Sequence, residues 1–219
     1  MAVVVSIHEV ALALAYLGAL LGVVMVVPQI IRTIRHPHLT GVAPLSWAFT
    51  ALGCSLWLIF GLRTVTIPQI PGNVLLVSGA VAIVLLVPSA WSRWRRALTL
   101  GSAAAVLWTI AFIIPPHMIG YFAFAIGLYS MLPQLYESVW VNRKATESGL
   151  SIPTQILKVS SQSCWLAYAM LAIEMPVIVS AVFGVTTSVA VLVVEVARTR
   201  RNALAGLAPL PTPVLEPAH

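Results

Sequence analysis

A pattern that occurs twice constrains this chain more than any other feature of its sequence. Pro28 and Gln29 stand near the end of an apolar run and are followed by a short basic loop, and Pro133 and Gln134 repeat the arrangement. In each copy the loop closes with a glycine, and a tryptophan follows that glycine 16 residues later, inside the next apolar run. Duplicated hydrophobic segments that contain proline are typical of membrane transporters built from two repeats.

Composition places the chain in a lipid bilayer. Hydrophobic residues make up 60% of the 219 residues and charged residues 8%, whereas a soluble domain carries about a quarter charged residues. The net charge of +6 could indicate a nucleic-acid partner, but the basic residues form short clusters between apolar runs. Because such clusters are typical of membrane flanks, we expect the bilayer, and no nucleic acid, as a partner.

Hydropathy predicts an all-α membrane protein with seven transmembrane helices. A span needs roughly 17–25 apolar residues, and we expect spans at 10–31, 44–62, 70–90, 97–114, 118–139, 152–173 and 176–196. The N-terminal run lacks a basic leader, so we expect it to be retained and not cleaved as a signal peptide. The tail at 202–219 contains four prolines and is predicted to be disordered.

Lysine and arginine predict the orientation of these spans. The residues that fall on one side are Arg32, Arg35, Arg93, Arg95, Arg96, Arg143, Lys144, Arg198, Arg200 and Arg201, against Arg63 alone on the other. The basic side is cytoplasmic by the positive-inside rule. We therefore expect a multi-pass protein of the cell membrane with its N-terminus outside and its C-terminus in the cytoplasm. Arg93, Arg95 and Arg96 are expected to fix topology or to contact anionic lipid.

An odd number of spans per repeat explains the total of seven. Both repeats present their basic loop to the same side, so the two copies are parallel, and a single additional span must lie between them. The predicted organisation is a first three-helix bundle at 1–96, a linker helix at 97–117, a second three-helix bundle at 118–201 and the tail at 202–219.

These motifs resemble those of the PQ-loop / SWEET superfamily of transporters. The Pro-Gln pairs, the Thr-Gly-Val and Ser-Gly-Leu-Ser segments after the loops, and Trp57-x-x-Phe60-Gly61 carry the resemblance, with a looser copy of the last at Trp165. It covers residues 10–197. The resemblance implies two parallel three-helix bundles joined by a linker helix (3+1+3), a central solute pocket and alternating access. Family members include sugar facilitators, amino-acid exporters and cargo-binding receptors.

The resemblance also implies which residues contact the solute. The family's sugar pocket takes a tryptophan and an asparagine from each half, and Trp57 with Asn73 fits that pattern. Trp165 has Ala181 at the place of the second asparagine, and the neighbouring Ser180 is rotated by about 100° on a helix. We expect a facilitator of a small polar solute, with a sugar as the leading candidate. The alternatives are an amino acid, an organic anion, or a receptor that does not transport.

Each of these residues has a second interpretation from physical chemistry. Trp57 and Trp165 lie near the outer ends of their spans and could belong to the aromatic belt at the membrane interface. Asn73 could instead form a hydrogen bond between helices. Helical spacing predicts two walls of the expected cavity: a polar and cationic face of span 152–173 (Gln155, Lys158, Gln162 and Trp165) and a nearly apolar face of span 44–62 (Trp47, Thr50, Cys54 and Trp57). The six expected solute contacts are Trp57, Asn73, Trp165, Gln162, Lys158 and Cys54.

The prolines are interpreted in two groups. Pro28 and Pro133 each remove a backbone donor within a span and are predicted to act as hinges, with Gln29 and Gln134 able to hydrogen-bond the freed carbonyls. Pro44 and Pro153, counted with them as gating residues, stand in first-turn positions, where proline is tolerated.

Lys158 leaves three interpretations open. It could snorkel to the headgroups, pair with Glu137, or contact an anionic solute. No carboxylate lies deep in a span, which favours uniport. No catalytic or metal-ligand grouping is present in the sequence. We therefore expect no enzyme activity, no cofactor and no metal. Cys54 and Cys164 are expected to be free thiols, and a homo-oligomer is left open.

Overall fold

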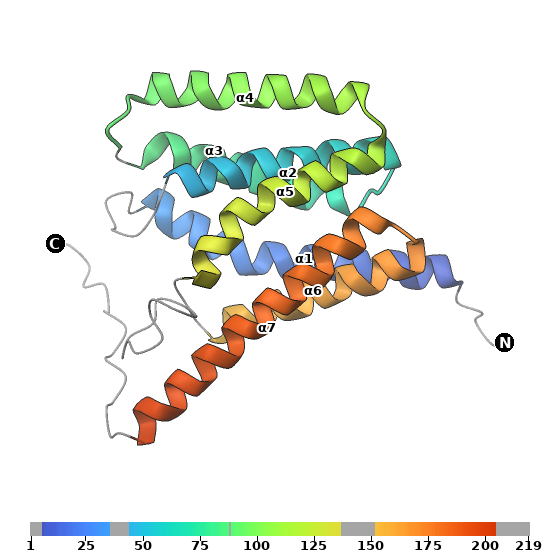
Figure 1. Cartoon of the computed structure of the whole chain (residues 1–219), viewed down its shortest axis with the longest axis vertical. Helices are drawn as coiled ribbons and strands as arrows, with labels where there is room; N and C mark the ends of the chain where they lie inside the picture. The colour runs from blue at the N-terminus through green and yellow to red at the C-terminus, as the bar shows by residue number, and fades with distance from the viewer. Residues whose placement is uncertain (1–5, 36–43, 88, 137–151, 205–219) are drawn as a thin grey trace.

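The computed structural model describes residues 6–35, 44–87, 89–136 and 152–204, and these residues form seven helices and no strand. The helices are α1 Ile7–Arg35, α2 Pro44–Thr64, α3 Gln69–Leu86, α4 Arg93–Ile113, α5 Pro116–Tyr136, α6 Ile152–Ala172 and α7 Met175–Leu204. They run side by side and alternate in direction, as Figure 1 shows. The prediction of an all-α fold with seven helices is confirmed.

Local caps explain where the helix ends differ from the predicted spans. α1 begins at Ile7 because Ser6 and Glu9 form a capping box, with the Glu9 Oε2 accepting from the Ser6 backbone N–H at 2.7 Å. α4 begins at Arg93, before the predicted start at residue 97, because the Ser92 hydroxyl accepts from the Arg95 N–H at 3.3 Å. The expected boundary between the first bundle and the linker therefore falls too late.

The C-terminal ends of two helices also depart from the prediction. α3 ends at Leu86, before residue 90, because Val87 precedes a proline and takes an extended conformation with ψ of 133°. α7 continues to Leu204, so the predicted disordered tail begins too early at residue 202. Good helix formers occupy 203 and 204, and the first proline of the tail stands at residue 209. Residues 205–219 lie outside the described part.

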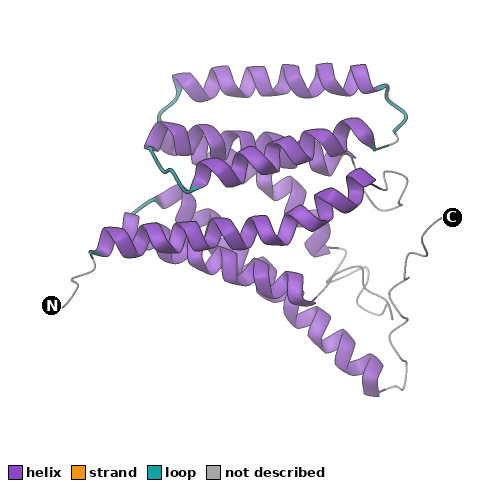
Figure 2. Cartoon of the chain, turned by 180° about the vertical axis from the view of Figure 1, so that it is seen from behind, coloured by secondary structure: helices purple, strands orange, loops and turns teal. Residues whose placement is uncertain are grey.

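The helices form two three-helix bundles with equivalent contacts. In the first bundle α3 packs against α1 and α2, and in the second α7 packs against α5 and α6. Between the bundles α1 lies against α6 and α2 lies against α5, a pairing that is unchanged when the halves are exchanged. α4 packs on α2 and α3 and so belongs in space with the first bundle, as both views show (Figures 1 and 2). The 3+1+3 arrangement is confirmed.

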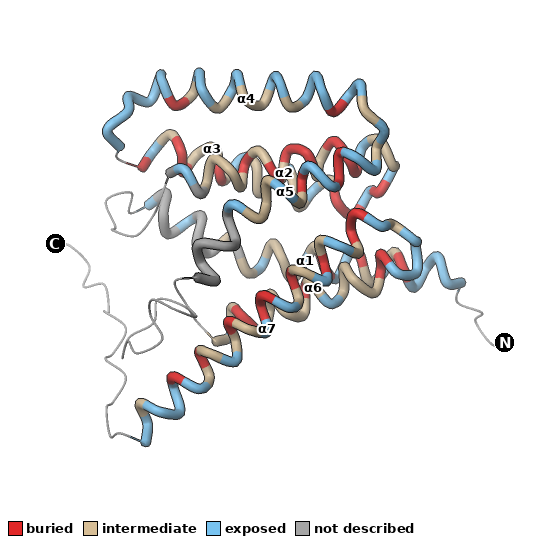
Figure 3. The backbone as a smooth tube through the Cα atoms, viewed as in Figure 1, coloured by how far each residue is buried: buried red, intermediate tan, exposed pale blue. Residues whose placement is uncertain are grey.

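Five of the seven helices are long and apolar enough to cross a membrane when only the described residues are considered: α1, α2, α3, α4 and α7. α6 is less apolar because it carries a polar face. Gln155 and Ser161 on that face are buried inside the protein, with 3% and 4% of their surface exposed. Many apolar side chains on the other helices are exposed, as expected where lipid replaces water (Figure 3).

Two arginines hold α4 at its ends. The Arg63 guanidinium donates to the carbonyls of Ala111 and Ile114 at 2.6 Å each, at the C-terminus of α4. Arg96, in the first turn of α4, is buried and donates to the carbonyls of Val84 and Val87 at the end of α3. The expectation that Arg96 contacts lipid is therefore wrong, because its guanidinium satisfies helix-end carbonyls instead. Arg93 and Arg95 remain exposed.

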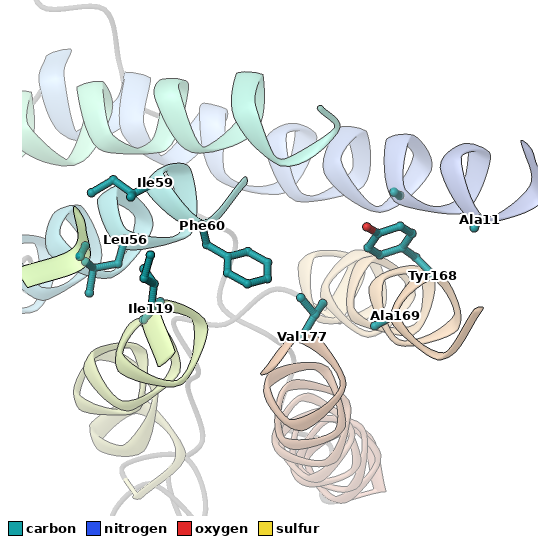
Figure 4. Close-up of a cluster of buried hydrophobic side chains, with 11 residues drawn as sticks. Ala11, Leu56, Ile59, Phe60, Ile119, Tyr168, Ala169 and Val177 are labelled. Atoms are coloured by element: carbon teal, nitrogen blue, oxygen red, sulfur yellow. The ribbon is translucent and has the colours of Figure 1, made fainter. Parts of the chain in front are cut away.

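The apolar core lies at the end of the molecule that is nearer the N-terminus. It takes side chains from both bundles, among them Leu56 and Phe60 of α2, Ile119 of α5 and Val177 of α7, which meet in Figure 4. Small residues of α1, Ala11 and Ala15, complete it. Among the described residues, this core joins the two halves at the end away from the basic loops, so a cavity between the bundles lies toward the basic end.

Candidate functional site: a cavity between the two bundles

A cavity of about 220 Å³ lies between the bundles, lined by residues of α1, α2, α3, α6 and α7. Along α1 its residues Gly18 and Gly22 follow the core alanines, so the cavity lies on the basic side of the core. Its polar and aromatic lining residues are Cys54, Trp57, Gln69, Asn73, Gln162, Trp165 and Ser180. Five of the six residues that the sequence predicted as solute contacts thus come together here.

The two indoles occupy equivalent positions and point inward. Trp57 makes an edge-to-face contact with Phe60, with ring centroids 5.5 Å apart at 87°. Trp165 makes the same contact with Tyr168, at 5.7 Å and 84°. Both indoles line the cavity and pack against the core. This placement does not fit the interpretation as interface-belt tryptophans. A flat indole surface suits the C–H face of a ring-shaped solute.

Glycines make room for the side chains that line the cavity. A Cβ atom on Gly18 would lie 3.1 Å from Cδ1 of Trp165, closer than ordinary van der Waals contact, so the absence of a side chain here favours the close approach of α1 to α6. A Cβ on Gly184 would lie 2.5 Å from Oε1 of Gln162, whose amide therefore lies across α7 at this glycine. The close approach of helices through small residues is typical of membrane bundles.

Asn73 forms its hydrogen bond within its own helix. Its side-chain nitrogen donates to the Gln69 carbonyl at 2.8 Å, one turn earlier in α3. Among the described residues it makes no hydrogen bond to another helix, so the interpretation of Asn73 as a link between helices is not supported. Asn73 lines the cavity.

Two lining residues depart from the sequence reasoning. Ser180 lines the cavity together with Ala181, although a rotation of about 100° between neighbours suggested that it would point elsewhere. Gln69, which the sequence analysis did not single out, also lines it and is buried, with 4% of its surface exposed. Its spacing of one helical turn from Asn73 is the signal that could have found it.

Lys158 lies outside the cavity lining. It is half-buried on α6, between the fully buried Gln155 and the cavity residue Gln162, and makes no hydrogen bond or ion pair among the described residues. Glu137, its suggested partner, lies outside the described residues. On the matching face of α2, Cys54 and Trp57 line the cavity, whereas Trp47 packs against a cluster on α3.

Beyond the core, a hydrogen-bonded link joins the two halves. The Glu174 carboxylate, at the α6–α7 turn, accepts from the Tyr168 hydroxyl at 2.7 Å and from the Thr66 hydroxyl of the α2–α3 turn at 3.2 Å. Thr66 and Glu174 stand 108 residues apart, the same separation as Trp57 and Trp165. The link therefore joins equivalent turns of the two repeats.

The prolines in the predicted hinges are described through their helices. α1 continues through Pro28 and Gln29 to Arg35, and α5 ends at Tyr136, shortly after Pro133 and Gln134. Pro44 is the first residue of α2, and Pro153 stands in the first turn of α6. The expected first-turn placement of these last two is confirmed. The side chains of Pro28, Gln29, Pro44, Pro133 and Gln134 lie outside the described residues.

The described residues contain no grouping of histidine, cysteine or carboxylate side chains that could hold a metal. Cys54 and Cys164 are both free thiols. The chemistry of this site is therefore that of amides, indoles and small hydroxyls.

The fold and the cavity define a membrane protein of two parallel three-helix bundles around a solute-sized space. A solved structure of a eukaryotic SWEET transporter has the same fold, with a TM-score of 0.74, 14% sequence identity, and an alignment that covers 89% of this chain and 99% of that chain. The resemblance found in the motifs is confirmed at the level of the fold. No family model matches the chain, and no curated protein matches it significantly.

Proposed function

We propose that this protein is a membrane facilitator that carries a small polar solute, a sugar as the leading candidate, through the central cavity by alternating access. The observation that carries the proposal is the cavity between the bundles, lined by Trp57 and Trp165 from equivalent positions of the two repeats. A site at the interface of two repeats can be exposed to either side when one bundle rocks against the other.

Charge favours a neutral solute over the anionic alternative. The described lining residues carry amides, indoles, a thiol and a hydroxyl, and no charged side chain is among them. A carboxylate or phosphate in this cavity would lose its hydration without gaining a cation, which costs several kcal/mol. No carboxylate is among the described lining residues, and the partly buried Glu174 takes part in the link beyond the core, which supports uniport over proton coupling.

Flux through proteoliposomes tests the function. We expect the purified chain to exchange labelled D-glucose across the membrane, and Trp57→Ala and Trp165→Ala each to reduce that exchange about tenfold or more through lost stacking. Trp108→Ala is the matched control, because Trp108 lies on α4 and is 39% exposed, away from the cavity. Saturable binding of a solute without flux would instead assign the chain to the receptors.

Orientation is proposed from the basic residues, with the N-terminus outside the cell. Ala90 and His117 lie before and after α4 and are exposed, so a cysteine at either position reports on one side of the membrane. An impermeant thiol reagent applied to intact cells should label the cysteine at 117 and spare the one at 90. The opposite labelling pattern would reverse the model.

A further inference from the structure

The two bundles present different chemistry to the cavity at equivalent positions. Gln69 and Asn73 of α3 correspond to Val177 and Ala181 of α7, and all four line the cavity. One wall therefore carries two side-chain amides, one helical turn apart, about 6 Å along the helix axis. The α7 residues opposite are apolar at both levels, and Ser180 is the one polar side chain that α7 itself contributes to the described lining. The amide of Gln162, from α6, lies about one turn further along α7, at Gly184.

Gln69 is held in place by a matched small residue on α2. A Cβ atom on Gly61 would lie 3.0 Å from Cβ and 3.6 Å from Oε1 of Gln69, so the glutamine side chain packs directly over this glycine. In the second half the equivalent pair is Ala169 and Val177. The first half thus combines a larger polar side chain with a smaller neighbour. This packing fixes the Gln69 side chain in the cavity wall.

The Gln69 side-chain amide lacks a hydrogen-bond partner for its oxygen among the described residues. Its Oε1 is buried and accepts no hydrogen bond among the described residues. Buried acceptors are nearly always paired, and one left alone costs about 1–3 kcal/mol. The oxygen packs toward Gly61, while the residue itself lines the cavity, so rotation of the amide toward the cavity would let a solute hydroxyl satisfy it. The other buried amide oxygen without a partner, on Gln155 of α6, does not line the cavity.

We propose that Gln69 is a specificity-determining residue that supplies the hydrogen bond which Ala181 cannot, so that the cavity selects a neutral hydroxylated ring with one polar and one apolar edge. This proposal rests on the proposed function and names the solute class of the same cavity. The hydroxyl-bearing edge lies against α3, where Gln69 and Asn73 both donate and accept. The deoxygenated or C–H edge lies against Val177 and Ala181 of α7. The indoles cover the faces of the ring.

Size is consistent with a single ring. The cavity of about 220 Å³ is smaller than the pockets of about 300–1,000 Å³ that hold drug-sized ligands, which fits one small solute.

The test is a deoxy scan of a sugar probe. Binding of D-glucose and its 1-, 2-, 3-, 4- and 6-deoxy analogues to the purified full chain is measured by calorimetry, with exchange in proteoliposomes measured in parallel. We expect removal of hydroxyls along one edge to weaken binding about five- to tenfold and removal along the opposite edge to have no effect. In Gln69→Met, D-glucose should bind about five- to tenfold more weakly. The analogue that lacks the hydroxyl bonded to Gln69 should then bind with the same affinity as D-glucose.

Two further variants keep the test decisive. Gln155→Met is the matched control, since it also removes a buried amide with an unpaired oxygen but lies outside the cavity, and it should leave the order of the analogues unchanged. Ala181→Asn adds an amide to the apolar wall. In this variant, removal of a hydroxyl from the sugar edge that faces α7, which has no effect in the unmodified chain, should weaken binding about five- to tenfold. This second variant reports on the walls even where Gln69→Met folds poorly.

Two results would overturn the proposal, and they are distinguishable. If D-glucose binds and is exchanged but the order of the analogues is the same in Gln69→Met and Ala181→Asn as in the unmodified chain, the assignment of the walls is wrong while the proposed function stands. If none of the sugars binds or is exchanged, both the solute class and the proposed sugar transport fail.

Discussion

At the scale of single residues, the site contains pairs in which a glycine on one helix leaves room for a glutamine side chain on a neighbouring helix. Gln162 and Gly184 form such a pair, as do Gln69 and Gly61, and in each the glycine belongs to a different helix from the glutamine. The positions equivalent to Gln162 and Gly184 in the first half hold Cys54 and Leu76. The two halves therefore place large and small side chains on different members of a neighbouring helix pair, so that one large side chain packs against one small one.

Gly184→Ala tests this pairing. A Cβ atom there would lie 2.5 Å from Oε1 of Gln162, the flexible end of a side chain, so the fold should survive while the amide is displaced from the cavity. We expect D-glucose to bind several-fold more weakly, with a change of at most a few degrees in apparent Tm. In a Gln162→Ala background the same substitution should cost nothing, because the displaced group is absent; a double-mutant cycle without coupling would contradict the pairing. Gly101→Ala, where no atom lies within 4 Å, is the control.

At the scale of the elements, the helices end in the same way in both repeats. Val65 after α2 and Ile173 after α6 both take a positive φ of 58°. The following N–H groups, of Thr66 and Glu174, donate back to the carbonyls of Gly61 and Ala169 at 2.8 and 3.0 Å. These bonds are typical of a helix C-cap with a left-handed residue, a place that usually belongs to glycine. The chain instead uses β-branched residues there, at a cost of about 1–2 kcal/mol each.

Val65→Gly and Ile173→Gly should therefore stabilise the protein. Both side chains are 75% exposed, so their removal forfeits little burial. The relief of strain exceeds the entropy that glycine adds to the unfolded chain, about 0.5–1 kcal/mol, and a net gain of up to about 1 kcal/mol is expected. Apparent Tm in detergent measures it. Val74→Gly, within α3 and 47% exposed, is the control and should lower the Tm. A lower Tm in both glycine cap variants would show that the caps are unstrained.

The same scale includes the proposed hinges. Pro28 lies within α1 and Pro133 near the end of α5, at corresponding places of the two bundles. Because proline removes one backbone hydrogen bond and weakens the helix locally, we expect Pro28→Ala/Pro133→Ala to fold and to bind solute normally but to exchange it several-fold more slowly. Stopped-flow flux at saturating solute separates rate from affinity. An exchange rate equal to that of the unmodified chain would remove the hinge role.

At the scale of the whole molecule, the two halves are joined at one end by the apolar core and by the carboxylate of Glu174. This carboxylate bonds to a residue of each half, Tyr168 in the second and Thr66 in the first. Since the cavity lies on the other side of the core, opening of this end would require the link to break. We therefore expect the Glu174 hydrogen bonds, together with the apolar core, to hold the two halves together at this end.

Removal of the link should shift the equilibrium between closed and open ends. Spin labels on Leu62→Cys and Met170→Cys, exposed and at equivalent places of the two halves, report the separation, with both native cysteines replaced. We expect Glu174→Ala to populate longer distances about tenfold more than the parent, since hydrogen bonds to a charged group contribute about 1.5–3 kcal/mol each. Thr186→Val, which removes a hydroxyl bonded only within α7, is the control. Unchanged distance distributions in Glu174→Ala would show that the link does not hold the two halves together at this end.

The sequence by itself predicted the number of helices and the two repeats, and its resemblance to the superfamily implied that Trp57, Asn73 and Trp165 line one pocket. It could do so because hydropathy, helical periodicity and motifs that recur in the same order are local or one-dimensional features of a chain. Only the tertiary structure decided that Gln69 and Ser180 join the cavity, that Lys158 does not, and that Arg96 binds carbonyls of α3. Those outcomes depend on how closely two backbones approach, and that distance is set by residues on different helices, such as Gly61 opposite Gln69.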